Sequence, residues 1–149
     1  MNKEIKFRAW DKGNKVMLTW DDFFYKFSET PEDIYGSLDG THNHLMELMQ
    51  YTGLKDKNGV EIYEGDLVII TERENIGTFN VPDDIIANNG YTGREDIYQG
   101  EVKYQGCAFG IDDKDYGFIY LEWDKDYGSA EVIGNIYENP DLLKPLTNK

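Results

Sequence analysis

Residues 5–10, IKFRAW, alternate between apolar and polar positions, and this period of two predicts a β-strand with one buried face. Residues 11–15, DKGNK, predict a turn, because Gly13 and Asn14 tolerate positive φ angles. Residues 16–20, VMLTW, then resume as a second strand. The start of the chain is therefore expected to form a β-hairpin.

An aromatic segment follows at residues 23–27, FFYKF, and its density of rings favours a place in the core. Residues 30–33, TPED, predict a short helix that ends by Gly36, because Thr caps, Pro suits the first helical position and acids favour the positive end of the helix dipole. Residues 45–49, LMELM, fit either a helical turn or a buried strand, and periodicity alone does not separate the two.

The pattern is most informative at residues 50–68, QYTGLKDKNGVEIYEGDLV. Asn58-Gly59 favours the positive φ angles of a tight hairpin, and Gly65 allows a bend after the return strand. Residues 67–71 are an apolar, β-branched run that fits a buried strand. The segment predicts a hairpin followed directly by a bend into a core strand.

Residues 73–99 are the least regular part of the chain, and we expect an excursion between strands there, with one helical turn at residues 82–86. Apolar runs return beyond Gly100, separated by acidic turns that contain glycine. The strands expected in this part span residues 101–104, 107–111, 118–123 and 130–136, followed by a closing turn at 139–143 and a tail at 144–149.

Composition agrees with a β-rich fold, since the 149 residues include 11 Tyr, 7 Phe, 3 Trp and 15 Gly. Aromatic side chains favour pleated surfaces and glycine marks turns. We expect a mainly β fold, α+β at most, with short-stranded antiparallel sheets, an N-terminal hairpin and one or two short helices. The expected single domain comprises residues 1–49 (hairpin and aromatic segment), 50–143 with the excursion at 73–99, and the tail.

Charge and cysteine content narrow the functional classes. The net charge of −14 repels the phosphates of nucleic acids and the anionic surface of membranes, so neither direct nucleic-acid binding nor membrane association is expected. Cys107 is the only cysteine, which suits a reducing compartment. The N-terminus lacks the apolar core of a signal peptide, and no apolar run approaches the about 20 residues of a membrane helix. A cytoplasmic location is expected.

His42 and His44 are the first candidates for metal binding, because this spacing places both imidazoles on one face of a strand, with Asp39 near in the sequence. A zinc site needs three or four ligands, however, and the chain has no other histidine. The letters HNH also differ from the nuclease motif of that name, whose residues are spread over a ββα unit. A polar surface turn is the preferred interpretation.

The acidic turns are the second candidate, because hard cations prefer carboxylates. Their glycines come one position too early for an EF-hand loop, so solvated turn acids are the better interpretation. The acids concerned are Asp112, Asp113, Asp115, Asp124 and Asp126.

Catalytic constellations are not apparent in the sequence. Adjacent acids at residues 21–22, 83–84 and 112–113 would point to opposite faces of a strand and do not form a dyad. Cys107 follows Gly106 within an apolar run, has no histidine near it in the sequence, and is expected to be buried in a strand. We assign no catalytic, cofactor-binding or metal-binding residues.

Three separated blocks of the sequence resemble the YopX family of phage and prophage proteins. They are residues 5–11 with Met17 after them, residues 50–68, and residues 131–140 followed by Leu142-Leu143. The blocks occur in the family's order and span almost the entire chain. The resemblance implies a small β-rich fold with a compact barrel in the C-terminal part, and the run GDLV at 65–68 suits an SH3-like or similar barrel by analogy.

The resemblance implies no established activity, no catalytic residues and no cofactor, so three hypotheses stay open. The first is a non-catalytic accessory protein that binds itself, as a homo-oligomer, or a host or phage protein through exposed aromatic residues and strand edges. The second is an acidic decoy that occupies a host nucleic-acid-binding protein. The third is an enzyme whose site is assembled from separated acids and tyrosines.

Overall fold

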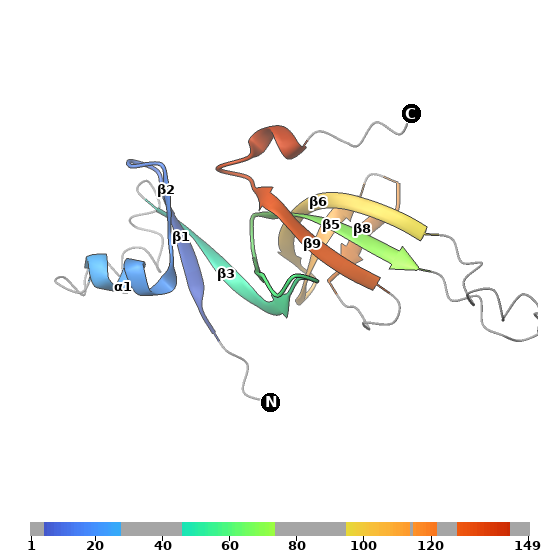
Figure 1. Ribbon diagram of the computed structural model, residues 1–149, viewed down its shortest axis with the longest axis horizontal. Helices are drawn as coiled ribbons and strands as arrows, with labels where there is room; N and C mark the ends of the chain where they lie inside the picture. Colours follow the sequence, from blue (N-terminus) through green and yellow to red (C-terminus); the bar gives the residue numbers. More distant parts are fainter. Residues whose placement is uncertain (1–4, 28–45, 74–94, 114, 122–127, 144–149) are drawn as a thin grey trace, which may run out of the picture.

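The computed structural model describes residues 5–27, 46–73, 95–113, 115–121 and 128–143. In this part of the chain nine strands, one α-helix and one 3-10 helix form two antiparallel sheets and their connections (Figure 1). The expectation of a mainly β fold is confirmed.

The first sheet has the strand order β2-β1-β3-β4. β1 (Phe7–Asp11) and β2 (Val16–Leu18) pair in the predicted N-terminal hairpin. The left-handed residue of the turn is Lys15, with φ of 54°, and not Gly13 or Asn14 as the sequence suggested. The buried carboxylate of Asp11 accepts hydrogen bonds from both of those N–H groups, and this Asx turn moves the left-handed residue to the end of the loop.

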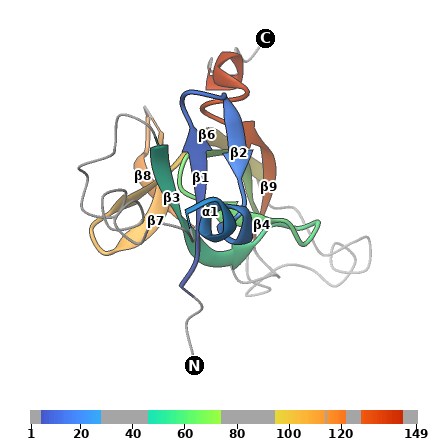
Figure 2. The same cartoon turned by 90° about the vertical axis from the view of Figure 1, so that its left-hand side faces the viewer.

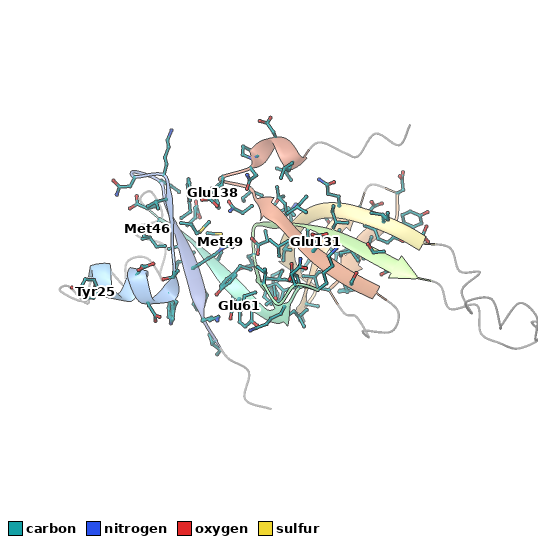
Figure 3. All side chains as sticks on the ribbon, in the orientation of Figure 1. Tyr25, Met46, Met49, Glu61, Glu131 and Glu138 are labelled. Carbon is teal, nitrogen blue, oxygen red and sulfur yellow. The ribbon has the colours of Figure 1, made fainter. Side chains whose placement is uncertain are left out.

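α1 (Trp20–Phe27) follows β2 and was not predicted. Thr19 and Asp22 form a reciprocal cap: the Asp22 N–H donates to Thr19 Oγ1 (3.2 Å), and the Thr19 hydroxyl donates to Asp22 Oδ2 (2.6 Å). Tyr25 is 85% exposed and points away from the sheet, so the placement of the aromatic segment in the core is wrong for this residue (Figure 3).

β3 (Met46–Lys55) shows that residues 46–49 form a strand rather than a helical turn. Its first half pairs with β1, with Phe7 opposite Gln50, and its second half pairs with β4 (Glu61–Tyr63). β3 therefore runs from the first sheet towards the second (Figure 1).

The β3–β4 turn is the hairpin predicted from Asn58-Gly59, with Gly59 at φ of 86°. Asp56, which is 7% exposed, supports it from inside. Its Oδ1 atom accepts hydrogen bonds from the backbone N–H groups of Asn58 (2.8 Å) and Val60 (2.9 Å). The turn is therefore held by a buried carboxylate as well as by glycine.

The second sheet has the order β8-β7-β6-β5-β9 and is antiparallel throughout. Its strands are β5 (Asp66–Arg73), β6 (Glu95–Gln105), β7 (Ala108–Asp113), β8 (Gly117–Tyr120) and β9 (Gly128–Asn135). β6 pairs with β5 up to Glu101 and with β7 from Val102 onward. The sheet curls at this change of partner into a half barrel (Figures 1 and 2).

Every strand of the second sheet except the short β8 contributes at least one buried side chain to the core of the half barrel. Ile62, from β4 of the first sheet, also belongs to this core. The cluster consists of Ile62, Val68, Ile70, Tyr98, Val102, Phe109, Ile111, Leu121 and Ala130. The presence of Ile62 shows that the β3–β4 hairpin covers the open side of the curled sheet.

The β3–β4 turn also closes the β9 edge. Oδ2 of Asp56 accepts a hydrogen bond from the Val132 N–H (3.1 Å), and the Lys57 N–H donates to the Ala130 carbonyl (2.9 Å). Lys57 and Glu131 form an ion pair beside these bonds (2.6 Å). Edge groups of β9 are thus bound within the protein itself.

The observed strands extend into the segment 73–99, where the sequence suggested an excursion. Arg73 ends β5 and residues 95–99 begin β6. The helical turn expected at 82–86 and the helix expected at 30–36 lie outside the described residues. The predicted closing turn is present as the 3-10 helix η1 (Pro140–Leu143), whose Leu142 carbonyl accepts a hydrogen bond from the Gln99 side chain (2.6 Å).

Among the described residues, no helix has the length and apolar character needed to cross a membrane.

Candidate interaction surface

A charged cluster lies where the two sheets meet. Nη2 of Arg8 contacts Oδ1 of Asp66 at 2.6 Å, and the guanidinium lies 4.8 Å from the centre of the Tyr63 ring. Asp66 is 1% exposed, and its second oxygen accepts a hydrogen bond from the Tyr63 N–H (2.8 Å). Burial raises the pKa of Asp66, and the positive charge of Arg8 opposes that shift. These groups bind one another and join the sheets, although Nε of Arg8 is buried without a hydrogen-bond partner among the described residues.

The outer part of this cluster consists of Lys6, Glu61 and Tyr63 (Figure 3 labels Glu61). Lys6 pairs with Glu61, and the Tyr63 hydroxyl donates to Glu61 (2.9 Å). Burial, together with Glu61, raises the pKa of Tyr63 to about 12, whereas the hydrogen bond from Lys6 lowers the pKa of Glu61. At neutral pH Tyr63 keeps its proton and Glu61 stays ionised, so neither is suited to proton transfer.

β8 is an edge strand of the second sheet (Figure 2). The Leu121 N–H donates to the Phe109 carbonyl (2.8 Å), and Ile111 lies opposite Ile119. Because antiparallel bonding alternates along a strand, the N–H and C=O groups of Phe118 and Tyr120 point away from β7. No strand among the described residues pairs with that side. β8 therefore presents a short row of backbone donors and acceptors, which we term the β8 edge.

Two aromatic rings accompany the β8 edge. Phe118 and Tyr120 lie on one face and contact each other edge to face, with ring centres 5.2 Å apart, and Tyr120 is 50% exposed. The Phe118 ring packs over Gly110 of β7, where a Cβ atom would lie 2.5 Å from that ring and 2.3 Å from the Ile119 carbonyl oxygen. Glycine at 110 thus leaves room for the Phe118 ring against β7.

Asp112 borders these rings, because it lies opposite Phe118 in the β7–β8 ladder and on the same face. Nζ of Lys103, from β6, lies 3.3 Å from Oδ2 of Asp112 and 3.6 Å from Oε2 of Glu101. Burial opposes the charge on Lys103, but Asp112 and Glu101 hold the pKa of Lys103 above its ordinary value. The arrangement places a carboxylate and a paired ammonium beside two rings.

The other acids of this turn have a structural role. Oδ1 of Asp113 accepts hydrogen bonds from the backbone N–H groups of Asp115 (2.8 Å) and Tyr116 (3.0 Å). Asp113 thus forms an Asx turn, which the interpretation as solvated turn acids did not include. Asp124 and Asp126 lie outside the described residues.

Cys107 differs from the expectation of a buried residue in a strand. It is exposed and lies with Gly106 in the two-residue turn between β6 and β7, where both have positive φ (74° and 59°). The apolar residues that suggested a strand begin one position later, at Ala108.

The remaining sequence candidates are not brought together. His42, His44 and Asp39 lie outside the described residues, as do Asp83 and Asp84. Asp21 and Asp22 are exposed in the first turn of α1. Within the described residues, no group of three or more His, Cys, Asp and Glu is placed to hold a metal ion.

Sequence reasoning missed the β8 edge as a particular surface, although it anticipated strand edges and exposed aromatic residues in general. The alternation of Phe118 and Tyr120 with Ile119 was a signal for a strand with one aromatic face. Which strand lies at an edge follows from the sheet order, and no local pattern reports that.

Comparison with known proteins gives one family. The model of the YopX protein family matches residues 6–144. Among solved structures, the chain is similar to protein EF1440 from Enterococcus faecalis, with 28% identity, a TM-score of 0.48, and coverage of 95% of this chain and 99% of that chain. It is also similar to protein yopX from Bacillus subtilis, with 23% identity, a TM-score of 0.44, and coverage of 93% and 97%. The chain matches no curated protein.

Proposed function

The chain belongs to the YopX family, and on that premise we propose that it is a non-catalytic accessory protein whose β8 edge pairs with an extended segment of a partner. The observation that carries this proposal is the outward direction of the Phe118 and Tyr120 backbone groups at the end of the second sheet. We take the partner to be a protein of a phage or of its host, in keeping with the origin that the resemblance implies.

Strand addition fits the β8 edge for two reasons. An extended peptide gains main-chain hydrogen bonds from an unpaired edge, and the side chains beside that edge give selectivity. Phe118 and Tyr120 supply large, rigid contact area, which is characteristic of residues that dominate binding energy. By contrast, the β9 edge is bound by Asp56 and Lys57. The two ends of the sheet thus differ in their capacity to receive a strand.

A non-catalytic role is also supported by the charged cluster at the junction of the sheets. Its members form ion pairs and hydrogen bonds with one another, and the pKa values of Tyr63 and Glu61 move away from neutrality. Catalytic acids and bases are shifted in the opposite sense, towards the working pH. The cluster is better suited to holding the sheets together than to transferring protons.

The acidic decoy is the second candidate, and the net charge of −14 is the observation that favours it. A decoy would act through the field of a wide surface, and loss of one ring would change little. Strand addition depends on a few groups at one edge. Substitution of Tyr120 therefore separates the two functions.

The test is a selection of random nine-residue peptides against the purified protein, followed by measurement of their affinity for variants. Tyr120→Lys is expected to weaken the affinity for the selected peptides at least about tenfold. The substitution removes the ring and also places a charged lysine on the edge, which discourages strand pairing. Tyr25→Lys, the same change on an exposed ring of α1, is the matched control and should leave affinity unchanged.

Hydrogen exchange locates the contact. Binding should slow exchange of the Phe118 and Tyr120 amides, which point outward, more than exchange of the Ile119 amide, which already faces β7. Peptides that bind Tyr120→Lys as well as the unchanged protein, with no protection on β8, would show that this edge is not the binding surface.

A further inference from the structure

The part of the chain around the β8 edge carries more negative than positive charges. Residues 95–121, which form β6 to β8 and their turns, carry six carboxylates and two lysines. Asp112 is the carboxylate beside Phe118, and its side chain is 57% exposed. An exposed carboxylate that neighbours aromatic rings is an arrangement that attracts a cation.

We propose that the segment received at the β8 edge is basic, with a lysine or arginine side chain that lies over Phe118 and Tyr120 and reaches Asp112. This inference rests on the proposed strand addition and adds the chemistry of the partner. The occupant is an extended segment of another protein in which basic residues recur at every second position, since alternate side chains share one face of a strand.

Strand spacing makes the contact feasible. Neighbouring strands lie about 4.8 Å apart, so an added strand would lie roughly 10 Å from β7. A lysine or arginine stem can cover much of that distance across the face of Phe118 while its charged head stays in water beside Asp112. The stem would pack on the ring, and the head would pair with the carboxylate.

Lys103 already holds the position of that cation. It is 45% exposed and pairs with Asp112 at 3.3 Å. A basic segment would therefore compete with Lys103 for the carboxylate. Removal of the Lys103 charge should strengthen binding of the basic segment, and removal of the Asp112 charge should weaken it. The two changes lie on the same face of the sheet and touch no core residue, so they differ only in their expected sign.

A second copy of this chain fits the surface less well. Residues 117–121, GFIYL, contain no basic side chain, so β8 paired with β8 would leave Asp112 without a new partner. Two copies that each carry a net charge of −14 also repel each other at moderate ionic strength. Charge complementarity thus favours a basic partner over self-pairing.

The experiment uses three capped nine-residue peptides of alternating valine and a second residue, which is lysine, glutamine or glutamate. Binding is measured on the full chain by chemical shifts and hydrogen exchange of the β8 amides. In 50 mM NaCl the lysine peptide should bind at least about tenfold more tightly than the glutamine peptide, and the glutamate peptide should not bind. The difference should shrink in 500 mM NaCl, where charges are screened within about 4 Å.

Two variants of opposite expected sign sharpen the result. Asp112→Asn should weaken the lysine peptide about fivefold, and Lys103→Gln should strengthen it by about threefold, since exposed pairs contribute modestly. Asp21→Asn and Lys15→Gln, which make the same charge changes at exposed sites outside the second sheet, are the matched controls and should have no effect.

The outcomes separate this inference from the function on which it rests. Equal protection of β8 by the lysine and glutamine peptides would overturn the basic preference and leave strand addition standing. Protection by none of the three would overturn both. A dimer in light scattering that Tyr120→Lys converts to a monomer would show that the occupant is a second copy, and it would also overturn the inference.

Discussion

Asp56 is the residue on which the closure of the half barrel depends. One of its oxygens supports the β3–β4 turn, and the other binds the Val132 N–H on β9. Burial opposes the charge of this carboxylate, but its backbone hydrogen bonds hold the pKa of Asp56 below the ordinary value of 3.8. The negative charge is therefore stabilised more in the folded protein than in the unfolded chain.

Asp56→Asn should lower the free energy of unfolding by about 2 kcal/mol at pH 7, because the amide cannot accept all three bonds. A lowered folded pKa contributes stability above the unfolded value, and that contribution disappears as the pH falls through the folded value. Urea unfolding should therefore show the gap between the two proteins narrowing from pH 7 to pH 3. A constant gap would mean that the charge of Asp56 contributes nothing.

Gly65 tests the role of backbone conformation at the bend before β5. Its φ is 74°, its N–H donates to the Val102 carbonyl (2.9 Å), and its carbonyl accepts from Ile136 (2.9 Å). A Cβ atom there would meet its neighbours at 3.5 Å, which is ordinary contact, so the cost of a side chain comes from φ.

Gly65→Ala should lower stability by about 1–2 kcal/mol, and Gly65→Val by more, because branched side chains disfavour positive φ further. Gly65→Asn is the control, since asparagine tolerates this conformation and should have the smallest effect. Thermal unfolding measures all three. A loss in Gly65→Asn that exceeds the loss in Gly65→Ala would assign the cost to side-chain size instead.

Asp56 and Gly65 show which features of the fold could be predicted from the sequence and which could not. Asn58-Gly59 and Gly65 were found because their conformational demand is local and visible in a few letters. Asp56 was not found as a support, because its third hydrogen bond is to a residue 76 positions away. The same limit applies to the ion pair between Arg8 and Asp66, 58 positions apart.

Among the turns and short helices, too, some were predicted from the sequence and others were missed. The N-terminal hairpin and the closing turn were predicted, because turn residues mark them. α1 was missed although Thr19 and Asp22 have the spacing of a capping pair, since alternation before them and Thr30-Pro31 after them gave stronger signals. The β6–β7 turn was misplaced by one residue, because it contains Gly106-Cys107 and not a familiar Asn-Gly pair.

The β6–β7 turn should therefore be improved by a residue that prefers positive φ. Cys107 has φ of 74° and is exposed, so Cys107→Gly removes an unfavourable conformation without removing packing. We expect a gain of up to about 1 kcal/mol, which raises the melting temperature of a chain this size by roughly 2–4 °C. Cys107→Ala is the control and should give no gain. A loss of stability in the glycine variant would show that the thiol makes a favourable contact.

The β3–β4 hairpin of the first sheet packs on the second sheet, with Ile62 in its core and Asp56 bonded to β9. Beyond this hairpin, Arg8 pairs with Asp66, and Trp10 stacks on Tyr137 with ring centres 5.3 Å apart. Met49 lies at the same junction, with its sulfur 3.6 Å from Nη2 of Arg8 (Figure 3). Because Asp66 is 1% exposed, its charge depends on Arg8 more than a surface carboxylate would.

Arg8→Met should lower stability by about 3 kcal/mol at pH 7, because it leaves a buried carboxylate without its counter-ion. Burial already raises the pKa of Asp66 and Arg8 opposes this, so the folded pKa rises further in the variant. The folded variant then binds more protons than the unfolded chain, and its stability falls as pH rises. Urea unfolding should show a smaller cost of Arg8→Met at pH 5 than at pH 7.

The double variant Arg8→Met/Asp66→Asn decides whether charge or packing holds the junction. Asparagine can still accept the Tyr63 N–H but carries no charge, so the double variant should be more stable at pH 7 than Arg8→Met alone. Its stability should also lose the extra pH dependence of the single variant. If the two changes add and the pH dependence persists, the sheets are held by the rings and by Met49, and the ion pair only fills the space between them.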